Sequence, residues 1–263
     1  MGNSLFKYGI SLVSVSENPL EIIGAVDTGI FKFVELTGVQ SELPGMPELL
    51  ATKNLKIANV RDFIEKNLSV NVCDQTDKMK KEFISCFRAK LESFSDKFME
   101  RGKSLSMDFS IENGLDSPLF EDSRIELVKK IALILYGGNT GFLVNARIPS
   151  AGKLSPAYLN SFLVKLMSAN VSLSVDIHPH EVAKKDDLDE IFRPFRFTAR
   201  QVNLVYEAET GNMLVEKLLD IWLAVLRKFD YRHSLIFCPV IKNPSHFISE
   251  MNRLGEMLQK KSS

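Results

Sequence analysis

The chain alternates between short apolar runs and longer stretches whose apolar residues recur every three or four positions. The short runs predict buried strands, and the longer stretches predict amphipathic helices. Eight strands are expected, at residues 8–15, 31–36, 55–60, 104–109, 142–145, 171–177, 200–206 and 235–240.

The stretches between these runs predict eight helices. The clearest covers residues 77–100, where four phenylalanines and a leucine recur at spacings of three and four and form one apolar face. Asn18, followed by proline, is expected to cap the first helix and Gly29 to end it, and Ser245 is expected to cap the last helix. The remaining helices are expected at residues 20–28, 47–53, 122 or 123 onward, 155–168, 186–190, 213–229 and 245 onward.

Strands and helices alternate without a long linker, a low-complexity tract or a break in composition. This order predicts a single α/β domain over residues 1–263, folded as a (β/α)8 TIM barrel, which typically has about 250 residues. A doubly wound open sheet is the alternative. In a barrel the carboxyl ends of the strands carry the functional site, so candidate residues are sought there.

Composition and charge exclude several classes of function. Lys and Arg number 33, as do Asp and Glu, so no bulk charge favours binding to nucleic acid or to an anionic membrane. The longest apolar run, residues 131–136, is far shorter than the roughly 20 residues of a membrane span. The N-terminus does not resemble a signal peptide, and the three cysteines form no CxxC pair. We therefore expect a cytoplasmic protein without a disulfide framework or a structural zinc site.

Several segments resemble a known family. They read EIIGAVDTGIFKFVEL at 21–36, NLKIANV at 54–60, VSLSVDIH at 171–178, VNLVY at 202–206 and FDYRHSLIFCPV at 229–240. In this order and at this spacing they are similar to the xylose isomerase-like barrels, a superfamily of sugar epimerases and isomerases, inosose-type dehydratases and apurinic endonucleases. The resemblance covers the whole chain and implies the barrel fold.

The resemblance also implies a comparison of metal sites. Active members of the family hold a divalent metal with Glu, Asp, His and Glu from strands five to eight, and the two Glu also move substrate protons. On the family pattern the corresponding residues here are Asn145, Asp176, Asn203 and Cys238, so one expected ligand remains. We therefore expect no cofactor and no metal ligands, with a divalent metal disfavoured and the metal-centred proton shuttle absent.

Three other family positions that often carry His are Arg61, Asp108 and Arg147 in this sequence. Two guanidinium groups beside a metal would repel it by about 1 kcal/mol or more per close pair. Their planar forks suit a phosphate or carboxylate of a ligand. They suit equally well ion pairs with Glu35, Asp108 or Asp176 across the barrel mouth, and the sequence leaves both roles open.

Strand six offers a second candidate cluster. Asp176, His178 and His180 lie two residues apart and would share one face of an extended strand, although Pro179 tends to end the strand there. They could form a small metal or acid/base cluster, or be an ordinary hydrogen-bonded mouth residue and two loop histidines. Glu35 ends strand two, where family members often carry a Glu that orients the substrate. The catalytic candidates are Asp176, Asp108, His178 and Glu35, and the substrate-binding candidates are Arg61, Arg147, Asn145 and Asn203.

Two functions remain open. One is an isomerase- or epimerase-like enzyme that acts on a small sugar, polyol or sugar acid through a rearranged site. The other is a non-catalytic barrel that binds such a molecule or another protein. Apurinic endonuclease activity is disfavoured, because the charge is balanced and the His and Glu of a multi-metal centre are missing. The sequence gives no indication of the oligomeric state.

Overall fold

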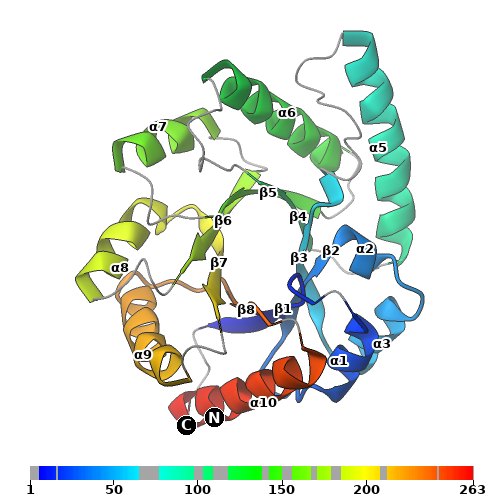
Figure 1. The fold of residues 1–263 in the computed structure, drawn as a ribbon. Helices are drawn as coiled ribbons and strands as arrows, with labels where there is room; N and C mark the ends of the chain where they lie inside the picture. Colours follow the sequence, from blue (N-terminus) through cyan, green and yellow to red (C-terminus); the bar gives the residue numbers. More distant parts are fainter. Residues whose placement is uncertain are drawn as a thin grey trace.

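A ring of strands forms the centre of the molecule. The computed structural model describes residues 6–15, 17–64, 77–97, 103–108, 118–137, 142–149, 156–166, 171–178, 185–207, 212–241 and 243–262. Eight parallel strands close into a barrel in sequence order, with helices around it (Figure 1). β1 pairs with both β2 and β8, which confirms the barrel and excludes the doubly wound sheet. The strands are β1 Lys7–Ser11, β2 Phe33–Thr37, β3 Lys56–Arg61, β4 Lys103–Asp108, β5 Phe142–Ile148, β6 Val171–Ile177, β7 Ala199–Tyr206 and β8 Ser234–Pro239.

The helices cover the outer face of the barrel, and α10 packs beside α1 to complete the outer layer (Figure 1). Among the described residues, none of the helices combines the length and the apolar character needed to cross a membrane. The helices are α1 Pro19–Ala25, α2 Gly38–Ser41, α3 Met46–Thr52, α5 Asp77–Lys97, α6 Pro118–Gly137, α7 Pro156–Leu166, α8 Lys185–Phe192, the 3-10 helix η4 Arg193–Phe195, α9 Asn212–Lys228 and α10 Pro244–Ser262.

Several helix ends differ from the prediction. The helix α6 begins at Pro118, before the predicted start at Asp122 or Ser123. Asn18 precedes α1 with a φ of 48°, and its side chain makes no capping hydrogen bond. The same helix ends at Ala25, before it reaches Gly29. At α10 the cap is Asn243, whose Oδ1 accepts a hydrogen bond from the amide of Ser245 at 2.9 Å. Ser245 therefore lies inside the first turn and does not cap it.

Strand bounds agree best where polar contacts do not interrupt the sheet. β6 covers the predicted residues 171–177, whereas β1 ends at Ser11, short of the predicted residue 15. The reason is Gln40 of α2, whose amide donates to the carbonyls of Leu12 and Val15, both at 2.8 Å. These side-chain bonds replace the sheet ladder and turn the chain away from the barrel.

The apolar core lies between the barrel and the helices. On α5, Phe87, Leu91 and Phe94 are buried, as their helical spacing predicts. Phe94 packs on Phe63 with ring centroids 5.0 Å apart. Large side chains from every layer are buried in the same continuous core, so the helices are held to the outside of the barrel mainly by apolar contact.

The inside of the barrel is polar along most of its length. TIM barrels usually fill this space with branched apolar side chains. Here the strand register places polar residues side by side, as with the pairs formed by Glu35 and Asn59 and by Asp176 and Asn203. The buried polar residues on the strands are Ser11, Glu35, Asn59, Ser104, Ser106, Asn145, Arg147, Ser172, Ser174, Asp176, Gln201 and Asn203.

Closer to the amino ends of β1, β2 and β8 the barrel interior is filled by apolar side chains, among them Phe33 and Ile236, and this part is called the apolar plug. A Cβ on Gly9 would lie 2.5 Å from Cδ1 of Ile236 and 2.8 Å from the carbonyl oxygen of Phe33. Approaches this short would force the neighbouring atoms to shift around any larger side chain, so glycine is favoured at this point of β1.

Candidate functional site

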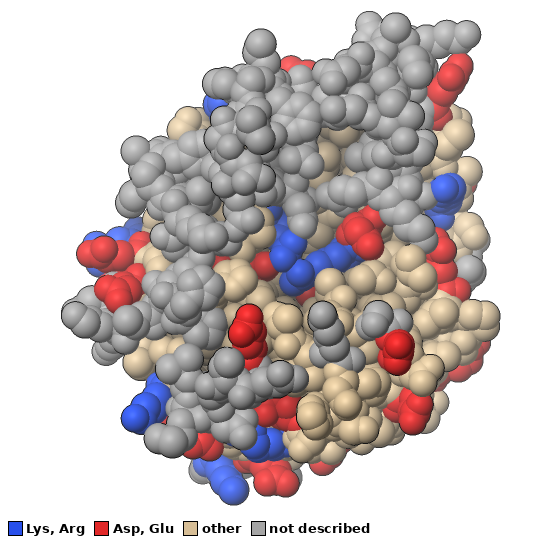
Figure 2. Space-filling model, viewed as in Figure 1, with Lys and Arg blue, Asp and Glu red and all other residues tan. Residues whose placement is uncertain are grey.

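Four charged candidates meet at the carboxyl ends of the strands. They are Glu35 on β2, Arg61 on β3, Arg147 on β5 and Asp176 on β6. The carboxylate side chains are 0% and 1% exposed, whereas the two arginine side chains keep 12% and 11% exposure. Figure 2 shows basic and acidic side chains next to each other near the centre of the face viewed along the barrel. Two positive and two negative charges therefore balance within the barrel mouth.

Glu35 lies at the centre of a set of hydrogen-bond donors. Its Oε2 accepts from the Ser11 hydroxyl at 2.7 Å and from Nη2 of Arg61 at 2.8 Å. Its Oε1 accepts from the side-chain amides of Asn59 at 3.0 Å and Gln201 at 2.9 Å. Both oxygens are therefore engaged by four donors from three other strands, β1, β3 and β7, which fixes the orientation of the carboxylate.

Asp176 is held by a second set of donors. Arg147 donates to Oδ1 through Nε at 3.2 Å and to Oδ2 through Nη2, a two-pronged ion pair. Asn203 donates to Oδ1 from its side-chain amide at 2.6 Å. This is the planar fork geometry in which Arg binds carboxylates best. Of the two roles left open for the arginines, ion pairing across the mouth is therefore observed.

Two side chains join these sets into one network. The amide of Gln201 donates to Glu35 and also to Oδ1 of Asn203 at 2.8 Å. Nη2 of Arg61 bonds Glu35 and lies 3.9 Å from Oδ1 of Asp176. The network therefore extends across the barrel through five side chains.

The electrostatics keep these groups in fixed protonation states. Burial would raise the pKa of Glu35, but the charge and hydrogen bond of Arg61, with the Asn59 bond, bring the pKa below its ordinary value. Burial would lower the pKa of Arg61, but Glu35 and Asp176 raise it. Burial, with Glu35 3.9 Å away, raises the pKa of the Cys238 thiol far above its usual range. That thiol is therefore protonated at neutral pH and is not an activated nucleophile.

The other candidates occupy different places. His178 follows β6, and its Nε2 lies 2.9 Å from the carbonyl of the residue after β5. Asn145 is one inward position deeper than Arg147, pairs in register with Ser172 and accepts a hydrogen bond from its hydroxyl. Asp108 ends β4 in register with Arg147, but its side chain lies outside the described residues. The β5 side chain that contacts Asp176 is therefore Arg147, and Asn145 lies below the network.

Sequence reasoning did not find Ser11, Asn59 and Gln201, which hold Glu35 in place. A signal for such residues is present in the strands, where polar residues occupy every second position in SLSMD, SLSVD and QVNLV. Strands buried on both faces normally read as continuous apolar runs. Period-two polarity in a predicted barrel therefore indicates a polar interior.

Solved structures with this fold include sugar-converting and nucleic-acid enzymes. A D-allulose 3-epimerase from Methylomonas sp. aligns with a TM-score of 0.68 and 13% identity over 98% of this chain and 99% of its own. A xylose isomerase domain protein from Planctomyces limnophilus aligns at 0.55 and 14% over 97% and 96%. A family 2 AP endonuclease from Brucella melitensis aligns at 0.61 and 17% over 93% and 96%.

The chain shares the (β/α)8 barrel fold of these solved structures. The resemblance seen in the sequence motifs is thereby confirmed at the level of the fold. No protein-family model matches the sequence, and no curated protein matches it.

The described residues at the mouth of this barrel are arranged as ion pairs and do not form a divalent-metal site. Within the described residues, no group of three or more His, Cys, Asp or Glu side chains is placed to hold a metal ion. Asp176 already accepts three hydrogen bonds, and a guanidinium nitrogen lies between it and Glu35. A metal here would meet two positive charges at close range, which repel it.

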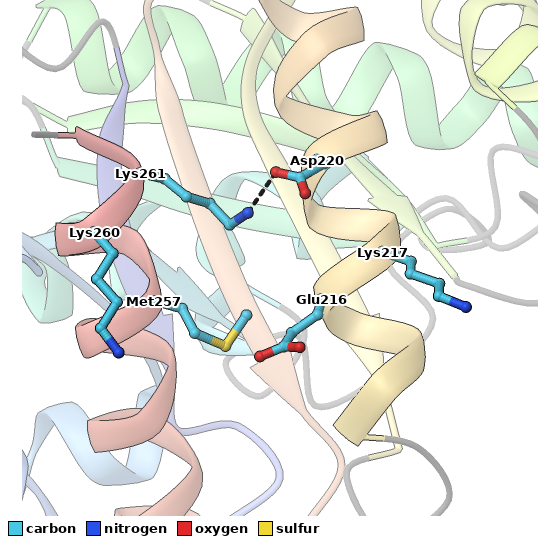
Figure 3. Close-up of a pocket in the computed structure, with 6 residues that line it drawn as sticks. All are labelled: Glu216, Lys217, Asp220, Met257, Lys260 and Lys261. Carbon is cyan, nitrogen blue, oxygen red and sulfur yellow. Dashed lines mark hydrogen bonds and ion pairs between the residues drawn. The ribbon is translucent and has the colours of Figure 1, made fainter.

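A separate groove of about 420 Å³ lies between α9 and α10 (Figure 3). One pair of charged groups faces across it, Lys261 and Asp220, which form an ion pair at 2.6 Å (Figure 3). This surface has the character of solvated helix faces, so the barrel mouth remains the candidate site. The groove is lined by Glu216, Lys217, Asp220, Met257, Lys260 and Lys261.

Proposed function

We propose that this barrel binds a small sugar, polyol or sugar acid at the carboxyl ends of its strands, without a divalent metal. The observation that carries the proposal is that each mouth guanidinium bonds a buried carboxylate while part of the arginine side chain still reaches solvent. A ligand hydroxyl can accept a hydrogen bond from such N–H groups and donate one in turn. The sugar epimerases among the structures with this fold support a ligand of that size.

Binding is better supported than proton transfer. A general base needs a carboxylate oxygen within reach of the substrate and a pKa near the working pH. Glu35 is fully buried, has donors on both oxygens and has a lowered pKa. Asp176 is held by Arg147 and Asn203. The proposed activity is therefore ligand binding, and metal-independent isomerisation is the alternative.

Calorimetric titration with D-allulose, D-fructose and D-gluconate, each with and without EDTA, tests the proposal. At least one of them should bind equally well in EDTA, and at 100 times its dissociation constant it should stabilise the fold by about 2.7 kcal/mol. Arg147→Gln should weaken binding. The matched control, Arg232→Gln, changes a surface arginine that is 66% exposed and pairs with Asp230, so it should leave binding unchanged.

Each other result contradicts a stated part of the proposal. If none of the three compounds binds, the mouth is not a sugar site. If EDTA abolishes binding, the metal-free part is wrong. If D-allulose or D-fructose is converted to another ketose in EDTA, the barrel is an enzyme and the isomerisation alternative replaces simple binding.

A further inference from the structure

Basic side chains gather at the amino end of the barrel, opposite the mouth. Arg200 is the second residue of β7, His233 directly precedes β8, and Lys7 begins β1. Gln201 and Lys7 both pair in register with Ser234, so Arg200, His233 and Lys7 come from the ends of neighbouring strands. All three side chains are exposed. This edge of the barrel therefore presents a row of basic groups to solvent.

The electrostatics of His233 show that these groups are close to one another. Its partial burial lowers its pKa, and the positive charges of Arg200 and Lys7 lower the pKa further. Within the described residues, no carboxylate forms an ion pair with either of these two cations. The three groups therefore repel one another, and a bound anion would relieve that repulsion.

The turn that leads into β7 adds arginines and an aromatic ring. It reads RPFRFTAR at 193–200 and contains three arginines without an acidic residue. Cζ of Arg196 lies 4.6 Å from the ring centroid of Phe197. Phe197 is 85% exposed, so most of its ring is open to solvent. Exposed apolar side chains next to cations are typical of a surface that binds a partner.

The end of α9 adds further positive charge, since α9 lies beside α8 and its last turn carries Arg227 and Lys228 (Figure 1). Asp189 is shared by Arg193 at 2.9 Å and Lys228 at 2.7 Å. Two carboxylates, Asp189 and Asp230, pair with members of this group, so positive charge is in excess here although the whole chain is balanced. The basic patch consists of Lys7, Arg193, Arg196, Arg200, Arg227, Lys228, Arg232 and His233.

We infer that the basic patch binds single-stranded nucleic acid, with the phosphodiester chain along its arginines and an unpaired base stacked on the ring of Phe197. Guanidinium groups match the geometry of phosphate oxygens. Stacking on an aromatic ring is how proteins hold single strands without reading their sequence. One exposed ring can stack a base but offers little apolar area for insertion into lipid. The patch is separate from the mouth, so the inference does not depend on the ligand bound there.

The test measures the fluorescence anisotropy of a labelled oligothymidylate of about 20 nucleotides with the full-length protein at several salt concentrations. Four cations of the patch have no carboxylate partner within the described residues, namely Lys7, Arg196, Arg200 and Arg227. Single strands release about 0.7 counterion per phosphate contact. The logarithm of the association constant should therefore fall with the logarithm of the salt concentration at a slope of about −3.

Charge reversal tests the role of the arginines. Arg200→Glu should weaken binding about tenfold at about 50 mM salt and should make the salt slope shallower by about 0.7 or more, because a phosphate contact is lost. The matched control is Arg88→Glu. Arg88 is an exposed arginine on α5, across the ring from α8 and α9, so its reversal should change the affinity less than about twofold (Figure 1).

Removal of the ring tests the stacking. Phe197→Ala should weaken binding about fivefold or more and leave the salt slope unchanged, because a stacked base contributes affinity without a phosphate contact. The matched control is Leu133→Ala on α6, which removes another apolar side chain that is 63% exposed. We expect it to bind like the wild type.

The contrary outcomes are distinct. No binding at about 50 mM salt, or an affinity independent of salt, would refute the inference. Equal losses in Arg200→Glu and Arg88→Glu would show attraction to the whole surface and not to the patch. Unchanged affinity in Phe197→Ala would refute the stacked base. Binding to phosphatidylserine vesicles, lost in Arg200→Glu, without binding of the oligonucleotide would assign the patch to a lipid surface. If Arg200→Glu does not fold, as judged by its melting temperature, Arg200→Gln decides by the same criteria.

Discussion

Glu35→Gln is the sharpest perturbation of the polar interior, because it keeps the size of the side chain and removes one buried charge. In the wild type this carboxylate accepts hydrogen bonds from Ser11, Asn59, Gln201 and Arg61. Glutamine can accept through one oxygen only, and of the four partners only the Ser11 hydroxyl could accept a hydrogen bond from its NH2 group. Arg61 would keep only the more distant Asp176 as a counter-charge.

The size of the effect follows from the distances. At an effective dielectric of about 20, the 2.8 Å contact between Arg61 and Glu35 is worth about 6 kcal/mol of Coulomb attraction, and the 3.9 Å contact with Asp176 about 4. The variant loses the first and keeps the second, and it no longer buries the glutamate charge, a cost of several kcal/mol. Breaking a buried pair from one side typically costs about 3–5 kcal/mol, and the surviving Asp176 contact places the expected loss near 3.

Urea denaturation of wild type and variant between pH 3 and pH 7 measures this loss. The folded-state pKa of Glu35 is lowered, so its contribution to stability is complete above the unfolded pKa of about 4.3 and is lost as the pH falls through the folded pKa. The difference between the two proteins should therefore be constant from pH 7 to about pH 5 and should shrink below about pH 4. The slope of free energy against urea should be unchanged.

The control for this experiment is Asp230→Asn, which removes a carboxylate that is 68% exposed and paired with Arg232. Surface pairs of this kind contribute about 1 kcal/mol or less. A loss below about 1 kcal/mol for Glu35→Gln at pH 7, or a loss that stays constant down to pH 3, would show that Glu35 is not the buried partner described above.

Three other expected outcomes follow from the structure. Asp176→Asn leaves the two-pronged fork of Arg147 without its counter-charge and should lower the free energy of unfolding by about 3 kcal/mol, measured in urea; unchanged stability would contradict a structural role. Gly9→Ala should destabilise by about 1–3 kcal/mol through the clashes at the apolar plug, whereas Gly24→Ala on α1, where a Cβ meets nothing, should stabilise slightly; equal effects would refute the packing argument. Cys238 should resist alkylation at pH 8 in the folded protein and react after denaturation, as peptide mass mapping would show; rapid labelling of the native protein would contradict its burial.

Much of the fold could be predicted from the sequence, because each strand turns one face toward the helices and so carries apolar residues at least at every second position. β6 was predicted to the residue for this reason. The ionised groups at the mouth could also be identified, since strand ends are where a barrel gathers them. The side chains that hydrogen-bond these groups could not be identified, because neighbouring strands in a barrel are staggered. The position of each residue along the barrel axis depends on that stagger.

Two register shifts show the difficulty. One lies between Val34 and Glu35 and one between Leu173 and Ser174, next to the residues that form the network. Each shift changes which inward residues lie opposite one another on neighbouring strands, and no local sequence pattern indicates where such a shift occurs. The family pattern implied a metal-ligand position for Asn145 together with Asp176, and the register of β5 on β6 pairs Asn145 with Ser172.

The polar interior connects residues that lie far apart in the sequence. Gln201 and Glu35 are separated by 166 residues, and Cys238 and Glu35 by 203. A partly folded chain with only the first strands assembled would leave the charged Glu35 without the hydrogen bond from Gln201 on β7. The entropy cost of closing so long a loop must be met before this contact can stabilise the chain. The hydrogen-bond network around Glu35 is therefore complete only when the ring closes, so the barrel should fold and open as a unit and not strand by strand.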